Sequence, residues 1–267
     1  MEDIVIMKKK LVIMGAGKLA TIIATCWKEG KMPAYDLIGI YSRTEEKAKL
    51  LAESVGTNYT TDKEEFLSWN ADIVAEAASV QAVRDNVIDI LKSNSDFVSL
   101  AIGAFADTDF YNEAMNVAQM LNRKIYIASG AIGGFDVMQT AKLMSSIDSK
   151  IVSETGPQYL TKTPIYKPEM MNSDGTVEAF NGNAKKAIEL LPSRVNVAVA
   201  TSLATNGPLD TNVTIQSTPG FIGDTHTIYV KGEEVDAKIS IYSKTSRIAG
   251  YSVVALLNNI ASPVQFF

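Results

Sequence analysis

The chain has 267 residues, of which 46% are hydrophobic and 21% are charged, and its formal net charge is −5 at pH 7. This length allows one large or two smaller domains with an ample core, and the acidic balance argues against nucleic acid as the main partner. No hydrophobic run approaches the roughly 18 residues of a membrane span and no signal-peptide pattern is present, which together predict a cytoplasmic enzyme or binding protein.

The first motif is an apolar strand that runs into a glycine turn. Leu11-Val-Ile-Met14 shows no alternation, and Gly15-Ala-Gly17-Lys-Leu-Ala20 opens a helical pattern. Gly15 would supply the turn, Gly17 would let the backbone approach a pyrophosphate, and Ala20 would permit close packing of helix on strand. The pattern predicts dinucleotide binding, and the alternative is an ordinary glycine turn. The expected phosphate contacts are Gly15, Gly17, Lys18 and Leu19.

The end of the second predicted strand, Leu37-Ile-Gly-Ile-Tyr41, should meet the adenosine ribose. An NAD-specific site usually has an acidic residue there to bind the 2′-hydroxyl, whereas this chain has Ser42 and Arg43 before a predicted helix over residues 44–54. A guanidinium makes charge-assisted hydrogen bonds to a 2′-phosphate, so this pair favours NADP over NAD. The alternative is that Arg43 is a solvated loop cation.

Strands and helices continue to alternate up to residue 128. Strands are expected over 72–76, 96–100 and 124–128, and helices over 80–91 and 109–121. Such alternation predicts a doubly wound parallel sheet of the Rossmann type. Ligands of these sheets collect at the carboxyl ends of the strands, so the loops Glu76–Ser79 and Ala101–Ala104 are expected beside the nicotinamide half of the coenzyme, with Ala77 and Ala78 as contacts.

The pattern changes after the turn Ser129-Gly-Ala-Ile-Gly-Gly134. A helix is expected over 135–144, a strand over 150–155, and helical stretches near 179–190 and 195–205. Three period-two runs follow, over 211–218, 225–230 and 235–243, and the turns between them suggest an antiparallel sheet. A last helix, capped by Thr245 or Ser246, is expected to return to the first domain. The fold class is therefore α/β, with a Rossmann domain over residues 1–129 and 244–267 and a second α+β domain with a mixed or antiparallel sheet over 130–243.

His226 is the only histidine in the sequence, and it is expected to face the same way as Ile228 and Val230 on a strand. Its unperturbed pKa of about 6.5 makes it the natural proton carrier at neutral pH. A lone histidine beside apolar residues is also commonly a packed core residue. One histidine and one cysteine leave no credible transition-metal site.

Four further residues have both a functional and a structural interpretation. Ala131 follows a predicted strand, and its backbone could contact the coenzyme or form a plain turn. Asn196 could hold the nicotinamide or the substrate, or it could cap a helix. Lys162 and Lys244 could meet a substrate carboxylate or be solvated surface charges.

Five segments together resemble the L-aspartate dehydrogenase family in order and spacing, over nearly the whole chain. They are Gly15–Ala20, Ser129–Gly134, Asn196–Ala204, Thr225-His226 and Lys244–Ser246. The resemblance implies NAD(P)-dependent oxidative deamination of L-aspartate to iminosuccinate, which hydrolyses to oxaloacetate and ammonia or feeds NAD biosynthesis. It also implies that His226 is the catalytic residue, that Ala131 and Asn196 contact the coenzyme, and that the protein is a homodimer or a larger homo-oligomer.

The chain departs from the family pattern at two positions near the expected substrate pocket. The family commonly has Asn immediately or two residues before the histidine, where this chain has Thr225 and Asp224. An Arg-Lys-Pro segment often found in the family is here Thr161-Lys-Thr-Pro164. The amino-acid substrate therefore stays open. The alternatives are another NAD(P)-dependent reductase, such as dihydrodipicolinate reductase or a homoserine or other amino-acid dehydrogenase, and a non-catalytic dinucleotide-binding protein.

Overall fold

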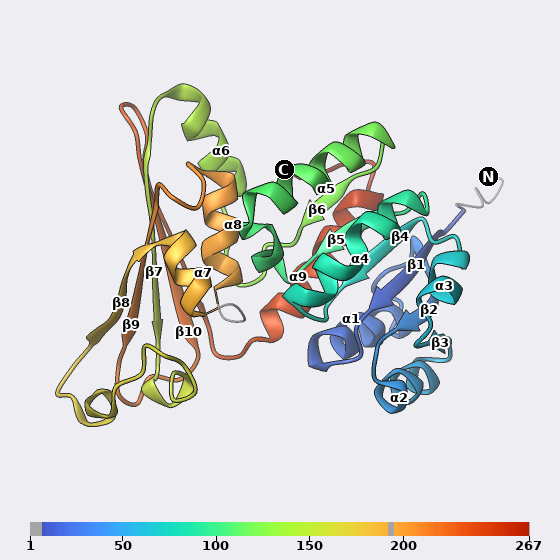
Figure 1. Cartoon of the computed structure of the whole chain (residues 1–267), viewed down its shortest axis with the longest axis horizontal. Coiled ribbons are helices and arrows are strands. Elements are labelled where there is room, and N and C mark those ends of the chain that lie inside the picture. The colour runs from blue at the N-terminus through green and yellow to red at the C-terminus, as the bar shows by residue number, and fades with distance from the viewer. Residues whose placement is uncertain (1–6, 192–194, 267) are drawn as a thin grey trace. The chain divides into compact units, whose positions relative to one another are not determined.

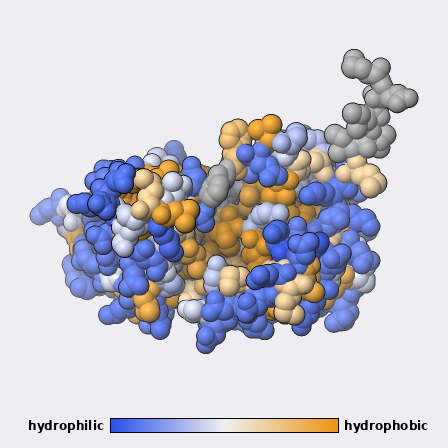
Figure 2. Space-filling view, turned by 90° about the horizontal axis from the view of Figure 1, so that it is seen from above, coloured by the Kyte–Doolittle hydropathy of each residue, from blue (hydrophilic) through white to orange (hydrophobic). Residues whose placement is uncertain are grey.

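A computed structural model describes residues 7–191 and 195–266 of the chain (Figure 1). These residues form two compact units, one of residues 7–128 and 249–266 and the other of residues 129–248. Within the described residues, none of the helices is both long enough and apolar enough to cross a membrane. Most of the surface visible in Figure 2 is hydrophilic.

The first unit is built on one parallel sheet, which confirms the predicted doubly wound fold. Its elements are β1 (Lys9–Met14), α1 (Lys18–Lys28), β2 (Tyr35–Tyr41), α2 (Glu45–Val55), β3 (Asn58–Thr60), α3 (Lys63–Ser68), β4 (Ile73–Glu76), α4 (Val80–Lys92), β5 (Asp96–Ser99), the 3-10 helix η1 (Ile102–Ala106), α5 (Thr108–Met120), β6 (Ile125–Ile127) and α9 (Arg247–Ala261). The strand order is β3-β2-β1-β4-β5-β6, and all neighbours are parallel. The short β3 and α3 are not expected from the sequence pattern.

Helices cover both faces of this sheet, which explains the apolar run without alternation in β1. All four residues from Leu11 to Met14 are buried. The helix α9 packs on α1, since a Cβ on Gly250 would lie 3.1 Å from Ile22, and the Tyr35 hydroxyl donates a 2.7 Å hydrogen bond to the Leu257 carbonyl. At the start of α9, the Arg247 N–H lies 3.4 Å from Oγ1 of Thr245, one of the two expected caps.

The second unit is a sheet with three helices on one face (Figure 1). Its elements are α6 (Phe135–Met144), β7 (Asp148–Thr155), the 3-10 helices η2 (Pro157–Tyr159) and η3 (Pro168–Asn172), β8 (Val177–Asn183), α7 (Ala184–Leu190), α8 (Asn196–Ala204), β9 (Thr211–Ser217), β10 (Asp224–Lys231) and β11 (Asp236–Ser243). The strand order is β11-β10-β7-β9-β8. This mixed sheet confirms the predicted second domain with a mixed or antiparallel sheet: β10 pairs with β11 and with β7 in antiparallel fashion. The last three strands are not consecutive in the sheet, because β7 lies between β10 and β9 and pairs with β9 in parallel.

The helical stretch expected near 179–190 is also wrong in its first half. Residues up to Asn183 belong to β8, an edge strand that pairs with β9. The helix α7 begins only after Asn183, whose side chain accepts a 2.9 Å hydrogen bond from the Lys186 N–H as an N-cap. Asn183 is therefore both the last residue of β8 and the N-cap of α7. The spacing of apolar residues in the sequence does not show this change from strand to helix.

Candidate active site

The order of the first sheet reverses between β1 and β4, and in such sheets the ligand crevice lies at this point beyond the carboxyl ends of the strands. A cavity of about 220 Å³ lies there, between the loops that follow β1, β2 and β4. Its lining residues are Met14, Gly15, Ala16, Gly17, Tyr41, Ser42, Arg43, Thr44, Lys47, Ala77, Ala78, Ser79, Ala82, Asp85 and Asn86. The cavity therefore brings together six of the expected coenzyme contacts.

The glycine turn has the geometry that a dinucleotide requires. Gly15 has φ +127, and a Cβ there would lie 2.6 Å from the Ala77 carbonyl oxygen, so any larger residue would push the two loops apart. Gly17 is the N-cap residue of α1, where no side chain caps the helix, and a Cβ on it would meet no atom within 4 Å. Open space above uncapped N–H groups fits a pyrophosphate.

Ser42 and Arg43 lie where β2 ends, at the edge of the same cavity. The Thr44 N–H lies 3.4 Å from the Ser42 hydroxyl oxygen, and the Arg43 side chain is exposed. Lys47 lines the cavity as well, one helical turn after Thr44 on α2. Lys47 is not among the contacts expected from the sequence, although its spacing from the end of β2 is a signal for such a contact.

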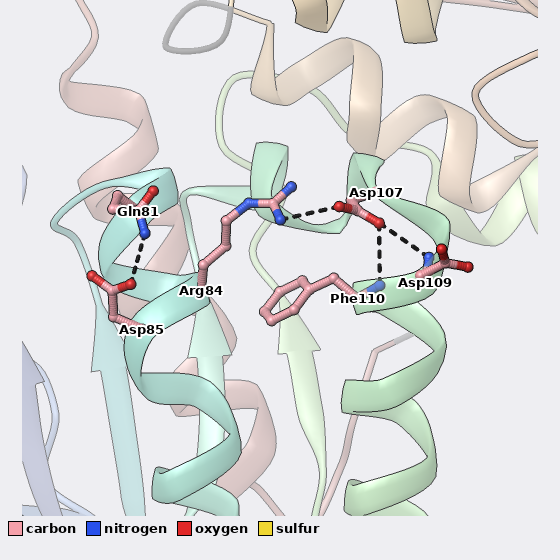
Figure 3. A network of polar contacts seen from close by, with 6 residues as sticks. All are labelled: Gln81, Arg84, Asp85, Asp107, Asp109 and Phe110. Carbon is pink, nitrogen blue, oxygen red and sulfur yellow. Dashed lines mark hydrogen bonds and ion pairs between the residues drawn. The ribbon is translucent and has the colours of Figure 1, made fainter.

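Two more lining residues were missed, and both belong to the second turn of α4. Asn86 is 7% exposed and donates a 2.8 Å hydrogen bond to the Ala82 carbonyl, while its Oδ1 has no hydrogen-bond partner among the described residues. Asp85 accepts a 2.6 Å hydrogen bond from Gln81 (Figure 3). A buried acceptor without a partner at a cavity wall fits a ligand that donates hydrogen bonds.

The other expected contacts of the first unit lie outside this cavity. Lys18 is exposed and Leu19 half-buried on α1, and neither lines it. The loop Ala101–Ala104, part of which forms η1, is buried and does not line it either.

In the second unit, His226 lies on β10 with its side chain on the helix-covered face of the sheet, in step with the buried Ile228 and Val230. Its Nδ1 lies 2.9 Å from Oγ of Ser153, its register partner on β7. Burial lowers the pKa of the imidazole because it disfavours the charged form, and the negative charge of Asp224 partly opposes this shift. The ring is therefore neutral at pH 7 and able to accept a proton.

Asn196 begins α8, and the other end of this helix lies beside the start of β9. The hydroxyl oxygens of Thr205, which follows α8, and Thr211 lie 3.0 Å apart. Thr211 is the register partner of Ser149 on β7. The cap of α8 is Val195, so the interpretation of Asn196 as the N-cap is wrong; it is the first helical residue.

The glycine-rich turn before α6 lies over β11 beside His226. A Cβ on Gly133 would be 3.5 Å from Cδ1 of Ile241, which is the register partner of His226. Ala131, half-buried, is two residues earlier in this turn. The turn that contains Ala131 therefore lies over Ile241, the neighbour of His226 on β11.

Lys162 and Lys244 are both exposed, in loops at the end of the sheet where β10 begins. The loop that contains Lys162 is tied there by a 3.0 Å hydrogen bond from Gln158 to the Phe221 carbonyl. Lys244 follows Ser243, the register partner of Asp224. Among the described residues, no three His, Cys, Asp or Glu side chains are grouped as a metal site requires.

Comparison with known proteins extends these observations. Residues 15–128 match the family model of the homoserine dehydrogenase NAD-binding domain, and residues 136–260 match that of the aspartate dehydrogenase C-terminal domain. A coenzyme-binding parallel sheet joined to this second domain defines an NAD(P)-dependent oxidoreductase. An L-aspartate dehydrogenase from Methanospirillum hungatei is 33% identical, over 94% of this chain and 96% of that protein, and one from Methanococcus maripaludis is 31% identical over 96% and 98%. The chain belongs to the L-aspartate dehydrogenase family.

Solved structures share the fold. The crystal structure of aspartate dehydrogenase from Thermotoga maritima superposes with a TM-score of 0.79 at 22% sequence identity, over 97% of this chain and 99% of that chain. A homoserine dehydrogenase from Thiobacillus denitrificans gives a TM-score of 0.65 at 14% identity, over 95% and 73%. Both likenesses concern the fold.

Proposed function

We propose that this protein is an L-aspartate dehydrogenase, which oxidises L-aspartate to iminosuccinate and, after hydrolysis, yields oxaloacetate and ammonia. The observation that carries the proposal is the pairing, in one chain of this family, of a glycine-turn cavity with an imidazole fixed by Ser153. In this proposal the Rossmann domain expected over residues 1–129 and 244–267 binds the coenzyme. The domain expected over residues 130–243 carries the catalytic and oligomerisation surfaces.

The nicotinamide coenzyme supplies the acceptor for the hydride that leaves the substrate Cα. His226 acts as the general base. When its Nδ1–H donates a hydrogen bond to Ser153, Nε2 is unprotonated and can take a proton from the water that attacks the imine carbon. In the reverse direction the same nitrogen returns a proton to the leaving hydroxyl. Ala131 and Asn196 position the coenzyme beside this base, and Lys162 and Lys244 supply positive charge for the carboxylates of the substrate.

NADP is the preferred coenzyme in this proposal. Ser42, Arg43 and Lys47 line one side of the cavity at the end of β2, where the ribose 2′-position is expected. Two cations and a hydroxyl suit a phosphate, and no acidic side chain stands among residues 42–44 to bind a 2′-hydroxyl.

The protein also acts as a homodimer or a larger homo-oligomer in this proposal. Helices of the described residues cover one face of the second sheet (Figure 1). By the strand register, Tyr229 and Tyr242 lie on the face opposite to His226 and Ile241, where they are 38% and 57% exposed. Light scattering behind size exclusion tests this assignment, and a monomer at micromolar concentration would refute it. We place the enzyme in the cytoplasm, which fractionation of cells of the source organism tests.

The deciding experiment is reductive amination of oxaloacetate with ammonia, run separately with NADPH and NADH. We expect ammonia-dependent oxidation of the coenzyme, faster with NADPH, and L-aspartate as the product. Reactions without ammonia report any reduction of the keto group, and a panel of other oxo acids tests the alternative dehydrogenases. Coenzyme binding without turnover of any oxo acid would instead identify a non-catalytic dinucleotide-binding protein.

A further inference from the structure

Glu76, the last residue of β4, is a carboxylate with 0% exposure. Its oxygens accept hydrogen bonds from backbone N–H groups of two different loops. Oε1 accepts from Ala78, at 2.6 Å, in the loop after β4, and Oε2 accepts from Leu100 and Ala101, at 3.0 and 2.8 Å, in the loop after β5. One side chain therefore joins the two loops.

A carboxylate at this position is costly for the fold. The other residues of β4 are apolar and buried, and burying a carboxylate costs several kcal/mol unless its hydrogen bonds are satisfied. Burial raises the pKa of Glu76, and the backbone N–H donors oppose that shift. Because those N–H groups only donate, the unprotonated carboxylate is the form that serves both loops at once.

The first of these loops is a wall of the coenzyme cavity. Ala77, Ala78 and Ser79 line it, and the Ala77 carbonyl is the group that a Cβ on Gly15 would strike. The second loop leads into η1 and on to Asp107, the N-cap of α5. The helices that follow these two loops, α4 and α5, are also joined by an exposed ion pair of 3.2 Å between Arg84 and Asp107 (Figure 3).

We propose that Glu76 is a positioning residue, which fixes the loop Ala77–Ser79 against the Gly15 turn and so sets the affinity for the coenzyme without touching it. This inference rests on the proposed coenzyme-binding role of the first unit. Glu76 fixes the loop through its two carboxylate oxygens. Oε2 is anchored by the Leu100 and Ala101 N–H groups, and Oε1 holds the Ala78 N–H in place.

The test is Glu76→Gln in the full chain without substrate. A glutamine has one acceptor oxygen, which serves the paired Leu100 and Ala101 donors, and its NH₂ then faces the Ala78 N–H. We expect the Kd for NADPH, from titration of coenzyme fluorescence, to rise at least about tenfold, which corresponds to about 1.4 kcal/mol. Hydrogen exchange should quicken over residues 77–79, and kcat at saturating coenzyme should stay within about threefold of the wild type.

Asp96→Asn is the matched control. Asp96 also accepts a backbone hydrogen bond, from Lys124 at 2.9 Å, but at the start of β5, and its replacement removes the same single charge. The NADPH Kd of this variant should equal that of the wild type. A Glu76→Gln Kd within twofold of the wild type, or an equal rise in both variants, would overturn the proposal.

Two measurements keep the inference testable if Glu76→Gln does not fold. In the wild-type protein without coenzyme, the amides of Ala78, Leu100 and Ala101 should exchange slowly, and exchange at the rate of free loops would contradict the proposal. Glu76→Asp, which is one methylene too short to reach both loops, should weaken NADPH binding in the same direction, and unchanged binding would contradict it. Failure of the wild type to bind either coenzyme would instead contradict the proposed function itself, and this result differs from a loss of binding in the Glu76 variants alone.

Discussion

The Ser153 hydroxyl and the His226 imidazole lie on neighbouring antiparallel strands, with Oγ and Nδ1 2.9 Å apart. The contact orients the ring, and in the tautomer whose Nδ1–H donates to Ser153 it leaves Nε2 as the base. Replacement by Ser153→Ala removes one neutral hydrogen bond, so we expect kcat to fall about 3- to 10-fold with unchanged NADPH affinity. Ser153→Thr keeps the hydroxyl and should restore most of the rate. Equal kcat in all three proteins would show that Ser153 does not orient the ring.

Loss of the imidazole should have a far larger effect on the rate. His226→Ala should lower turnover by roughly 10²- to 10⁴-fold, the usual contribution of general acid–base catalysis, and leave coenzyme Kd unchanged. Thr227→Ala is the control, since Thr227 is the next residue of β10, and its hydroxyl contacts Ser240 on the adjacent strand. Full turnover in the His226→Ala protein would rule out the assigned role.

The pH profile should report the lowered pKa of His226. A base must be unprotonated, so the acid limb of log(kcat/KM) should bend below pH 6.5, the ordinary value for histidine. Initial rates of aspartate oxidation in buffers of constant ionic strength measure this. A bend above pH 6.5 would show that the imidazole is stabilised in its charged form.

The same shift predicts how stability depends on pH. Between the lowered folded pKa and 6.5, the unfolded chain binds more protons than the folded chain, so the free energy of unfolding should rise with pH in that window. Urea titrations of wild type and His226→Gln should differ in slope there and agree in slope above about pH 7.5. Parallel curves throughout would mean that the shift is absent.

Arg43 should matter for one coenzyme and not for the other. Charge-assisted hydrogen bonds contribute about 1.5–3 kcal/mol, so Arg43→Ala should weaken NADPH binding about 10- to 100-fold and change NADH binding less than twofold. Lys47→Ala should act in the same direction. Lys49→Ala is the control, because Lys49 is exposed on the same helix and lies outside the cavity lining. An equal loss for both coenzymes would remove the 2′-phosphate assignment.

Asp107 links two helices of the first unit by different interactions (Figure 3). Its carboxylate caps α5 by accepting from the Asp109 and Phe110 N–H groups, and Arg84 pairs with it while lying 5.2 Å from the centre of the Phe110 ring. These contacts, the Phe110 N–H above all, lower its pKa. Asp107→Ala should cost about 1 kcal/mol of stability and lower the Tm by about 2–4 °C, measured by calorimetry. Asp109→Ala, which removes no cap, should shift it less.

The fold of the first unit could be predicted because local pattern and long-range structure agree there. Buried strands such as β1 are continuously apolar only where helices cover both faces, and the glycine turn after β1 marks the start of α1. The strand order of the second, mixed sheet could not be derived in the same way. Nothing in the residues of β7 says that it inserts between β9 and β10, since strand order depends on pairing between segments distant in the sequence.

The residues of the candidate site also divide into those that the sequence predicts and those that only the structure reveals. The loop residues Gly15, Ser42 and Arg43 are recognisable because they follow strands directly, and the fold places them at one cavity. Asn86 carries no such signal, and the strand-end position of Glu76 predicts its place near the cavity but not its hydrogen bonds to two loops. A buried amide on a helix and a carboxylate at a strand end acquire meaning only when their partners, Ala82 and the two backbone loops, are known.

The placement of α9 also governs how the protein can be made. Val253 and Leu257 are part of the core that includes Leu11 and Ile13, although they lie at opposite ends of the sequence. During translation, the coenzyme-binding unit must therefore wait for α9 to leave the ribosome, whereas residues 129–248 are complete earlier. A recombinant fragment that stops before Arg247 would lack one wall of its core and expose apolar side chains to aggregation.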